Sequence, residues 1–116
     1  MNRQAGIWID HKEAFVVFVD EGAEAHVRFN GPGEHGAADD KRERQLATHR
    51  GTYYDEVISH VRDAKSILLF GPGEAKGELE KRLVAMGLAE RVVGVETTDK
   101  MTGHQISAKV REHYEK

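Results

Sequence analysis

The spacing of apolar and polar residues along this chain is most informative between residues 66 and 86. Four consecutive apolar residues at positions 67–70 run into a Gly-Pro-Gly sequence, and apolar side chains then recur every three or four positions. This change of period predicts a buried strand, a tight turn and a helix that ends at Gly87. A strand that is apolar on both faces needs cover on both sides, so it belongs in the middle of a sheet with helices packed against it.

Four more segments have the pattern of strands. Residues 5–10 and 14–20 are rich in β-branched and aromatic residues, and the polar residues between them are typical of a hairpin. Residues 23–30 alternate apolar and polar side chains with a period of two, which predicts a half-exposed strand at an edge of the sheet. Residues 91–96 have the pattern of another buried strand.

Two further segments are predicted to be helical. Residues 41–63 place their apolar side chains on one helical face, which predicts one long amphipathic helix, or two short ones, with Gly51 as a weak point. The last helix has a start signal, because Thr102 and Gln105 have the spacing of a capping box.

The resulting order of elements is βββαβαβα. Strand-helix-strand crossovers make the first, fourth and fifth strands parallel, while the hairpins place the second and third strands beside the first. We therefore predict an α/β fold with a mixed five-stranded sheet in the order 3-2-1-4-5, an arrangement like that of ribonuclease H.

Composition narrows the class of protein. A chain of 116 residues with 39% hydrophobic and 32% charged residues fits one soluble globular domain over residues 1–116. The absence of cysteine excludes disulfides, thiolate metal sites and a cysteine nucleophile. No apolar run approaches the roughly 18 residues of a membrane span, and the N-terminus is unlike a signal peptide, so we expect a cytoplasmic protein without membrane contact.

A ligand site in such a sheet is expected beyond the carboxyl ends of the parallel strands. Asp10 follows the first strand there, and Gly71, Gly73 and Lys76 follow the fourth. Backbone N–H groups at the start of the next helix, together with Lys76, could hold a phosphate or a carboxylate. Alternatively, the glycines serve only to let the helix pack closely on its strand.

The sequence favours no catalytic chemistry. Two-metal nuclease chemistry needs several converging carboxylates, and Asp10 is the one well-placed candidate, which we expect instead to close the hairpin. The histidines lack the close spacing of a helix-borne metal site, and the serines lack a nucleophile-elbow pattern. We therefore expect neither an enzyme nor a bound metal or cofactor.

A basic segment follows the glycine-rich residues 31–40, which we expect to form a surface loop. This segment, residues 41–50, contains four cationic residues and one acidic residue, Glu43. Its local charge is therefore +3, although the whole chain has a net charge of −3. A loop next to a basic helix suits binding to the ribosome or to structured RNA, and the alternative is an ordinary solvated helix face. The candidate RNA-binding residues are His35, Lys41, Arg42, Arg44 and Arg50.

Three blocks of this sequence resemble the middle domain of the archaeal and eukaryotic class 1 peptide release factors and of their Pelota relatives. Residues 5–19 resemble the opening hairpin of that domain, and residues 67–79 resemble its strand, GPG-x-x-K turn and helix. Residues 31–46 occupy the place of its functional loop. The resemblance covers nearly the whole chain and implies the same βββαβαβα order.

The resemblance also implies what this chain lacks. Release factors carry Gly-Gly-Gln in that loop for hydrolysis of peptidyl-tRNA, whereas the corresponding residues 34–40 read EHGAADD. Pelota-type relatives also lack the motif and serve ribosome rescue. We therefore expect a stand-alone, non-catalytic protein of the translational machinery, with a role in rescue or stress.

Two other functions remain open from the sequence. One is a protein-interaction module or homo-oligomer that pairs through residues 23–30 or through the helix that carries Tyr53 and Tyr54. The other is a small phosphate-ligand binder at the GPG-x-x-K turn.

Overall fold

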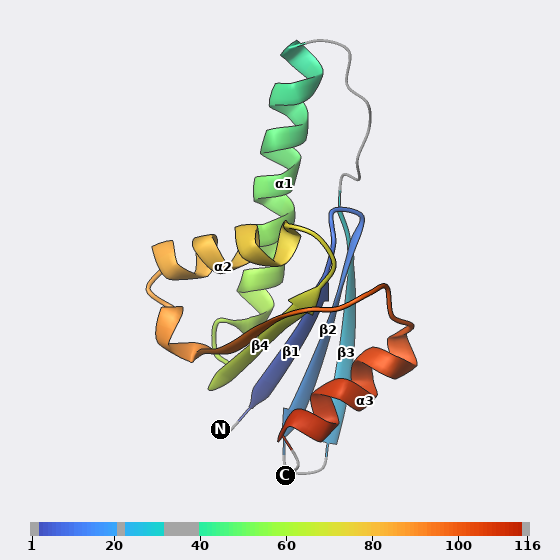
Figure 1. The fold of residues 1–116 in the computed structure, drawn as a ribbon. Helices are drawn as coiled ribbons and strands as arrows, with labels where there is room; N and C mark the ends of the chain where they lie inside the picture. The colour runs from blue at the N-terminus through green and yellow to red at the C-terminus, as the bar shows by residue number, and fades with distance from the viewer. Residues whose placement is uncertain (1–2, 21–22, 32–39, 115–116) are drawn as a thin grey trace.

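The structure is a computed structural model that describes residues 3–20, 23–31 and 40–114, with the side chains of residues 40–50 outside the description. Its strands are β1 (Gln4–Ile9), β2 (Glu13–Asp20), β3 (Ala23–Asn30), β4 (Ser66–Gly71) and β5 (Val92–Thr97). Its helices are α1 (Asp40–Val61), α2 (Ala75–Ala85) and α3 (Gly103–Tyr114), with a short 3₁₀ turn at Ala89–Arg91 (Figure 1).

The five strands form one mixed sheet in the order β3-β2-β1-β4-β5, which confirms the predicted topology. Strand β1 pairs antiparallel with β2 and parallel with β4, and β4 pairs parallel with β5. For most strands and helices, the predicted ends lie within one or two residues of the observed ends. Helix ends fray over that range, and methods of assignment differ by as much.

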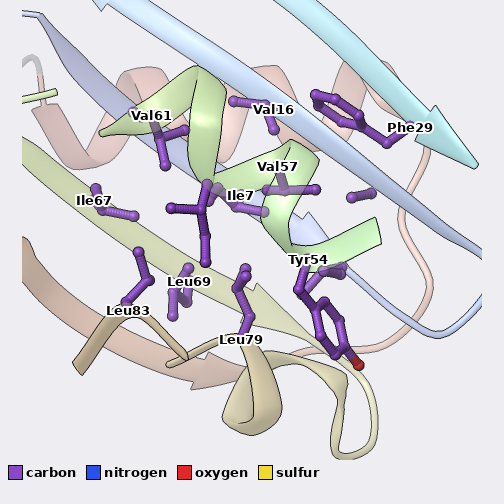
Figure 2. Close-up of a cluster of buried hydrophobic side chains, with 14 of the residues drawn as sticks. Ile7, Val16, Phe29, Tyr54, Val57, Val61, Ile67, Leu69, Leu79 and Leu83 are labelled. Atoms are coloured by element: carbon purple, nitrogen blue, oxygen red, sulfur yellow. The ribbon is translucent and has the colours of Figure 1, made fainter. Parts of the chain in front are cut away.

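Helices cover both faces of this sheet. On one face, α1 and α2 pack against alternate strand residues, and Figure 2 shows Val57, Leu79 and Leu83 converging with Ile7 and Leu69. On the opposite face, α3 packs through Ile106 and Val110 against a second cluster that includes Trp8, Leu68 and Phe70. Because β1 and β4 bury both of their faces, their sequences are apolar without alternation.

The two edge strands differ from each other in how well the sequence predicted them. Strand β3 lies at an edge of the sheet, as predicted, but it is more exposed than its alternating pattern predicts, because Phe29 is the one residue of the strand that is buried. The expectation that residues 91–96 form a buried strand is wrong, because β5 is the other edge and leaves Val93 49% and Val95 38% exposed. A run of valines indicates a strand, but its burial depends on which elements cover it.

Local signals at the ends of the helices are confirmed. The Thr102 N–H donates to Gln105 Oε1 at 2.9 Å, and the Gln105 N–H donates to Thr102 Oγ1 at 3.2 Å, which completes the capping box before α3. After the C-terminal end of α2, Gly87 has a φ of +78°, the left-handed conformation that commonly ends a helix.

Helix α1 is a single helix of 22 residues that continues through Gly51. Tyr53 and Tyr54 are only 4% and 3% exposed and belong to the core, so their side chains are not available for pairing with another chain. Pairing through the helix that carries them stays a prediction. The edge of β3 is exposed, and pairing through it stays a prediction.

Candidate functional site

The most prominent feature of the molecule is the first half of α1, which extends well beyond the ends of the strands (Figure 1). Lys41, Arg42, Arg44 and Arg50 lie on this half of the helix, and their side chains are outside the described residues. His35 also lies outside the described residues. A role of these five residues in binding RNA therefore stays a prediction.

Hydrogen bonds fix the base of this projecting helix to the sheet. The Tyr53 hydroxyl donates to the Asp10 carbonyl oxygen at 2.9 Å, and the Tyr54 hydroxyl donates to Glu78 Oε1 on α2 at 2.7 Å. His11 Nε2 lies 3.4 Å from Glu78 Oε2, so one carboxylate joins α1, α2 and the β1–β2 hairpin.

Burial raises the pKa of Tyr53 above its usual range, and the negative charge of Asp10 adds to this effect. Tyr53 therefore stays protonated and keeps donating to the Asp10 carbonyl throughout the neutral range. The tyrosines at this position were noticed in the sequence for their place on a helix, but their link to Glu78 was not expected. The one available signal in the sequence was a pair of adjacent tyrosines on an apolar helix face.

The chain leaves β3 directly beside this base. The Gly31 N–H donates to the Lys12 carbonyl oxygen at 2.8 Å. A Cβ atom on Gly31 would lie 2.5 Å from the His11 carbonyl oxygen and 2.8 Å from the Tyr53 ring, so only glycine fits there without a shift. The predicted functional loop therefore starts at a point that is closely packed against Tyr53.

Asp10 closes the hairpin, as predicted. Its Oδ1 atom accepts hydrogen bonds from the backbone N–H groups of Lys12 at 2.7 Å and Glu13 at 2.8 Å. The carboxylate thus acts as the hydrogen-bond acceptor that a backbone carbonyl group would otherwise provide in a tight turn. Within the described residues, no three His, Asp or Glu side chains are grouped so that they could hold a metal ion.

The Gly-Pro-Gly turn after β4 is shaped by two glycines with positive φ, +146° at Gly71 and +66° at Gly73. A Cβ atom on Gly71 would lie 2.3 Å from the Ile9 carbonyl oxygen. The close packing of β4 on β1 therefore requires glycine at this position. The Thr98 N–H donates to the Gly71 carbonyl at 3.1 Å, so the ends of β4 and β5 meet at this edge, as predicted.

Lys76 is largely buried and turns back toward this turn. Its Nζ atom donates to the Gly73 carbonyl oxygen at 2.6 Å. A depression of about 440 Å³ lies between the start of α2 and Val95, and its lining includes Lys76 and Lys81 together with Glu74 and Glu78. The binding of an anion by Gly71, Gly73 and Lys76 stays a prediction.

Neither a protein-family model nor a curated protein matches this sequence. Solved structures do match. Pelota from Archaeoglobus fulgidus superposes with a TM-score of 0.64 at 12% identity, over 97% of this chain and 31% of that protein. Pelota from Thermoplasma acidophilum gives a TM-score of 0.62 at 14% identity, over 95% of this chain and 36% of that protein.

The archaeal translation termination factor aRF1 also matches, with a TM-score of 0.57 at 14% identity, over 98% of this chain and 39% of that protein. This chain has the fold that these proteins share. The resemblance seen in the sequence is thereby confirmed at the level of the fold, and the chain spans about a third of the length of the proteins it matches. Within the described ranges, none of the helices is both long and apolar enough for a membrane span.

Proposed function

We propose that this protein is a non-catalytic component of translation that binds the ribosome or structured RNA. The observation that carries the proposal is the fold, because 95–98% of the chain superposes on Pelota and on a translation termination factor. A cytoplasmic location follows from this proposal.

The binding surface in this proposal consists of residues 31–50. Two observations support this surface. Helix α1 extends beyond the strands, and the candidate cations Lys41, Arg42, Arg44 and Arg50 all lie on the extended half. Lysine and arginine gathered on one projecting element can neutralise RNA phosphates even in a chain whose net charge is −3. The Tyr53 and Tyr54 hydrogen bonds hold the base of this element, which limits the entropy lost when it binds.

Peptide release is not part of the proposal. Residues 34–40 read EHGAADD, so they contain no Gly-Gly-Gln and carry three acidic residues in the stretch that corresponds to the functional loop of release factors. The proposed protein therefore occupies or senses a site on the ribosome without hydrolysing a bond there.

Ribosome pelleting and an RNA-shift assay at low salt test the proposal. The double variant Arg42→Glu with Arg44→Glu should weaken binding and reduce the slope of log K against log salt by about two, since two phosphate contacts are lost. A matched control is Arg62→Glu with Lys65→Glu, two exposed residues beyond the C-terminal end of α1. This control changes the net charge equally and should leave binding intact. Absence of binding by the wild-type protein in both assays would overturn the proposal.

A further inference from the structure

A hollow of about 350 Å³ lies on the face of the sheet that α3 covers, between the start of α3 and the ends of β1, β2 and β3. A volume of this size is at the lower end of the range for small-molecule sites. None of the residues that form it was singled out in the sequence as a site. The residues used below are Trp8, Glu13, Phe15, Arg28 and Lys100, which all line it.

Strand register builds the floor of this hollow. Trp8 on β1 pairs with Phe15 on β2, and Phe15 pairs with Arg28 on β3. Directly paired residues of a sheet point to the same face, so the three side chains form a row across the strands. Trp8 is buried, whereas Phe15 is only partly buried and presents its ring to the hollow.

Helix α3 leaves this row partly open because of where it begins. Val110 in the middle of the helix packs over Gly6, farther along β1, whereas the first helical residue, Gly103, approaches Phe15. A Cβ on Gly103 would lie 3.1 Å from two atoms of the Phe15 ring, so the helix comes close to the ring edge without a side chain over it. The hollow lies beside this contact, where Lys100, Met101 and Gln105 also line it.

Two cations stand at the rim. Arg28 is 64% exposed at its side chain, and its Nη2 atom forms an ion pair with Glu13 Oε1 at 2.9 Å. That pair orients the guanidinium while leaving most of its five donors directed elsewhere. Lys100 is exposed on the segment before α3, and within the described part of the chain it forms no ion pair.

An aromatic floor with cations at its rim has the chemistry of a nucleotide site, in which a base stacks on a ring and a phosphate meets lysine or arginine. We propose that this hollow binds one nucleotide of single-stranded RNA, with the base on Phe15 and the phosphate at Arg28 and Lys100. The proposal extends the proposed RNA binding and rests on it. Phe15 lies two residues along β2 from Glu13, which pairs with the last residue of β3, so the hollow is close to where the chain leaves for residues 31–50.

The structure provides a reporter inside the hollow. Trp8 is the only tryptophan of the chain, and its indole N–H donates to the Asp99 carbonyl oxygen at 3.3 Å. The chain therefore gives a single indole N–H signal in an NMR spectrum, and its chemical shift is expected to change when the hollow is occupied. Titration of the full chain with rU₅ and rA₅ oligonucleotides at low salt should shift this signal and saturate.

Variants of Phe15 separate stacking from packing. Phe15→Leu keeps an apolar side chain but removes the flat ring, and it should raise the Kd for the oligonucleotides about fivefold or more. Phe15→Tyr should bind like the wild type. Lys100→Gln should lower the salt slope by about one, whereas Lys65→Gln, at the opposite end of the sheet, should not change it.

The outcomes distinguish this proposal from the one above. If RNA binds and the Arg42 and Arg44 reversals weaken it, but the Trp8 signal stays fixed and Phe15→Leu binds normally, the hollow is not a nucleotide site and the proposed function stands. If the oligonucleotides shift Trp8 but ribosomes and structured RNA are not bound, the hollow is confirmed and the proposed function is wrong. A shift produced only by an apolar peptide would overturn the nucleotide assignment.

Discussion

The substitution Gly6→Ala tests how closely α3 is seated on the sheet. Gly6 lies in the middle of β1, and a Cβ atom there would lie 2.3 Å from Cγ2, 3.0 Å from Cγ1 and 3.1 Å from Cβ of Val110. Val110 is fully buried in the cluster under α3 and has no room to turn away. The added methyl group must therefore push α3 off the sheet or distort β1.

The expected cost follows from these contacts. Overpacking of this kind costs about 1–3 kcal/mol, and replacing a glycine in a strand returns roughly 0.5–1 kcal/mol. Gly6→Ala should thus lower the free energy of unfolding by about 1–2 kcal/mol. Val110→Ala alone removes two methyl groups and should cost about 2 kcal/mol, including the cavity that it leaves.

The double variant Gly6→Ala with Val110→Ala should be much less destabilised than the sum of the two single variants. The two contacts to Cγ atoms disappear, and one contact of 3.1 Å to Cβ remains. A favourable coupling of about 1–3 kcal/mol is expected for residues in direct contact.

Urea unfolding followed by Trp8 fluorescence measures these free energies, and thermal unfolding by circular dichroism checks them at about 4 °C per kcal/mol. A Gly6→Ala variant as stable as the wild type would refute the reasoning. Additive single and double variants would do so as well, since they would show that the two residues do not meet.

Three further predictions concern the turn after β4, the base of α1 and alkaline pH. Gly71→Ala should cost about 1–3 kcal/mol from the strained backbone alone, because its φ is +146°, whereas Gly77→Ala in α2 has open space and should be neutral or stabilising in the same urea experiment. Tyr54→Phe removes the 2.7 Å hydrogen bond to Glu78 and should cost about 1–2 kcal/mol; unchanged urea unfolding would contradict the role given to this bond. Burial raises the pKa of Tyr53, so its contribution is complete below about pH 10, the usual pKa of tyrosine, and is lost as the pH rises further, because the unfolded chain then releases a proton that the folded chain keeps. The free energy of unfolding should fall by up to about 1.4 kcal/mol per pH unit from this group, and Tyr53→Phe should flatten the decline; an identical pH profile in the variant would argue against it.

Local patterns in the sequence were enough to predict the fold, including the strand order. The two-residue period of β3, the change of period between β4 and α2, and the capping box before α3 each depend on neighbours in the chain. Crossover and hairpin rules then left one strand order. Gly71 and Gly73 were recognised in the sequence as a tight turn that lets the helix pack closely on its strand, whereas their positive φ was seen only in the structure.

Burial of β5 and the roles of Tyr53 and Tyr54 depended on tertiary structure. Whether a valine at position 93 or 95 is covered is decided by the helices that pack nearby, and no helix covers that edge fully. The two tyrosines carry an apolar ring and a hydroxyl, and only the folded arrangement shows that the hydroxyls reach Asp10 and Glu78.

The sequence by itself therefore determined the elements, their order in the sheet and the absence of cysteine or Gly-Gly-Gln chemistry, because these follow from local periodicity and residue identity. Only the tertiary structure decided that Trp8, Phe15 and Arg28 stand in one row beside the start of α3. Residues so far apart in the chain are brought together by strand register, which no local pattern contains.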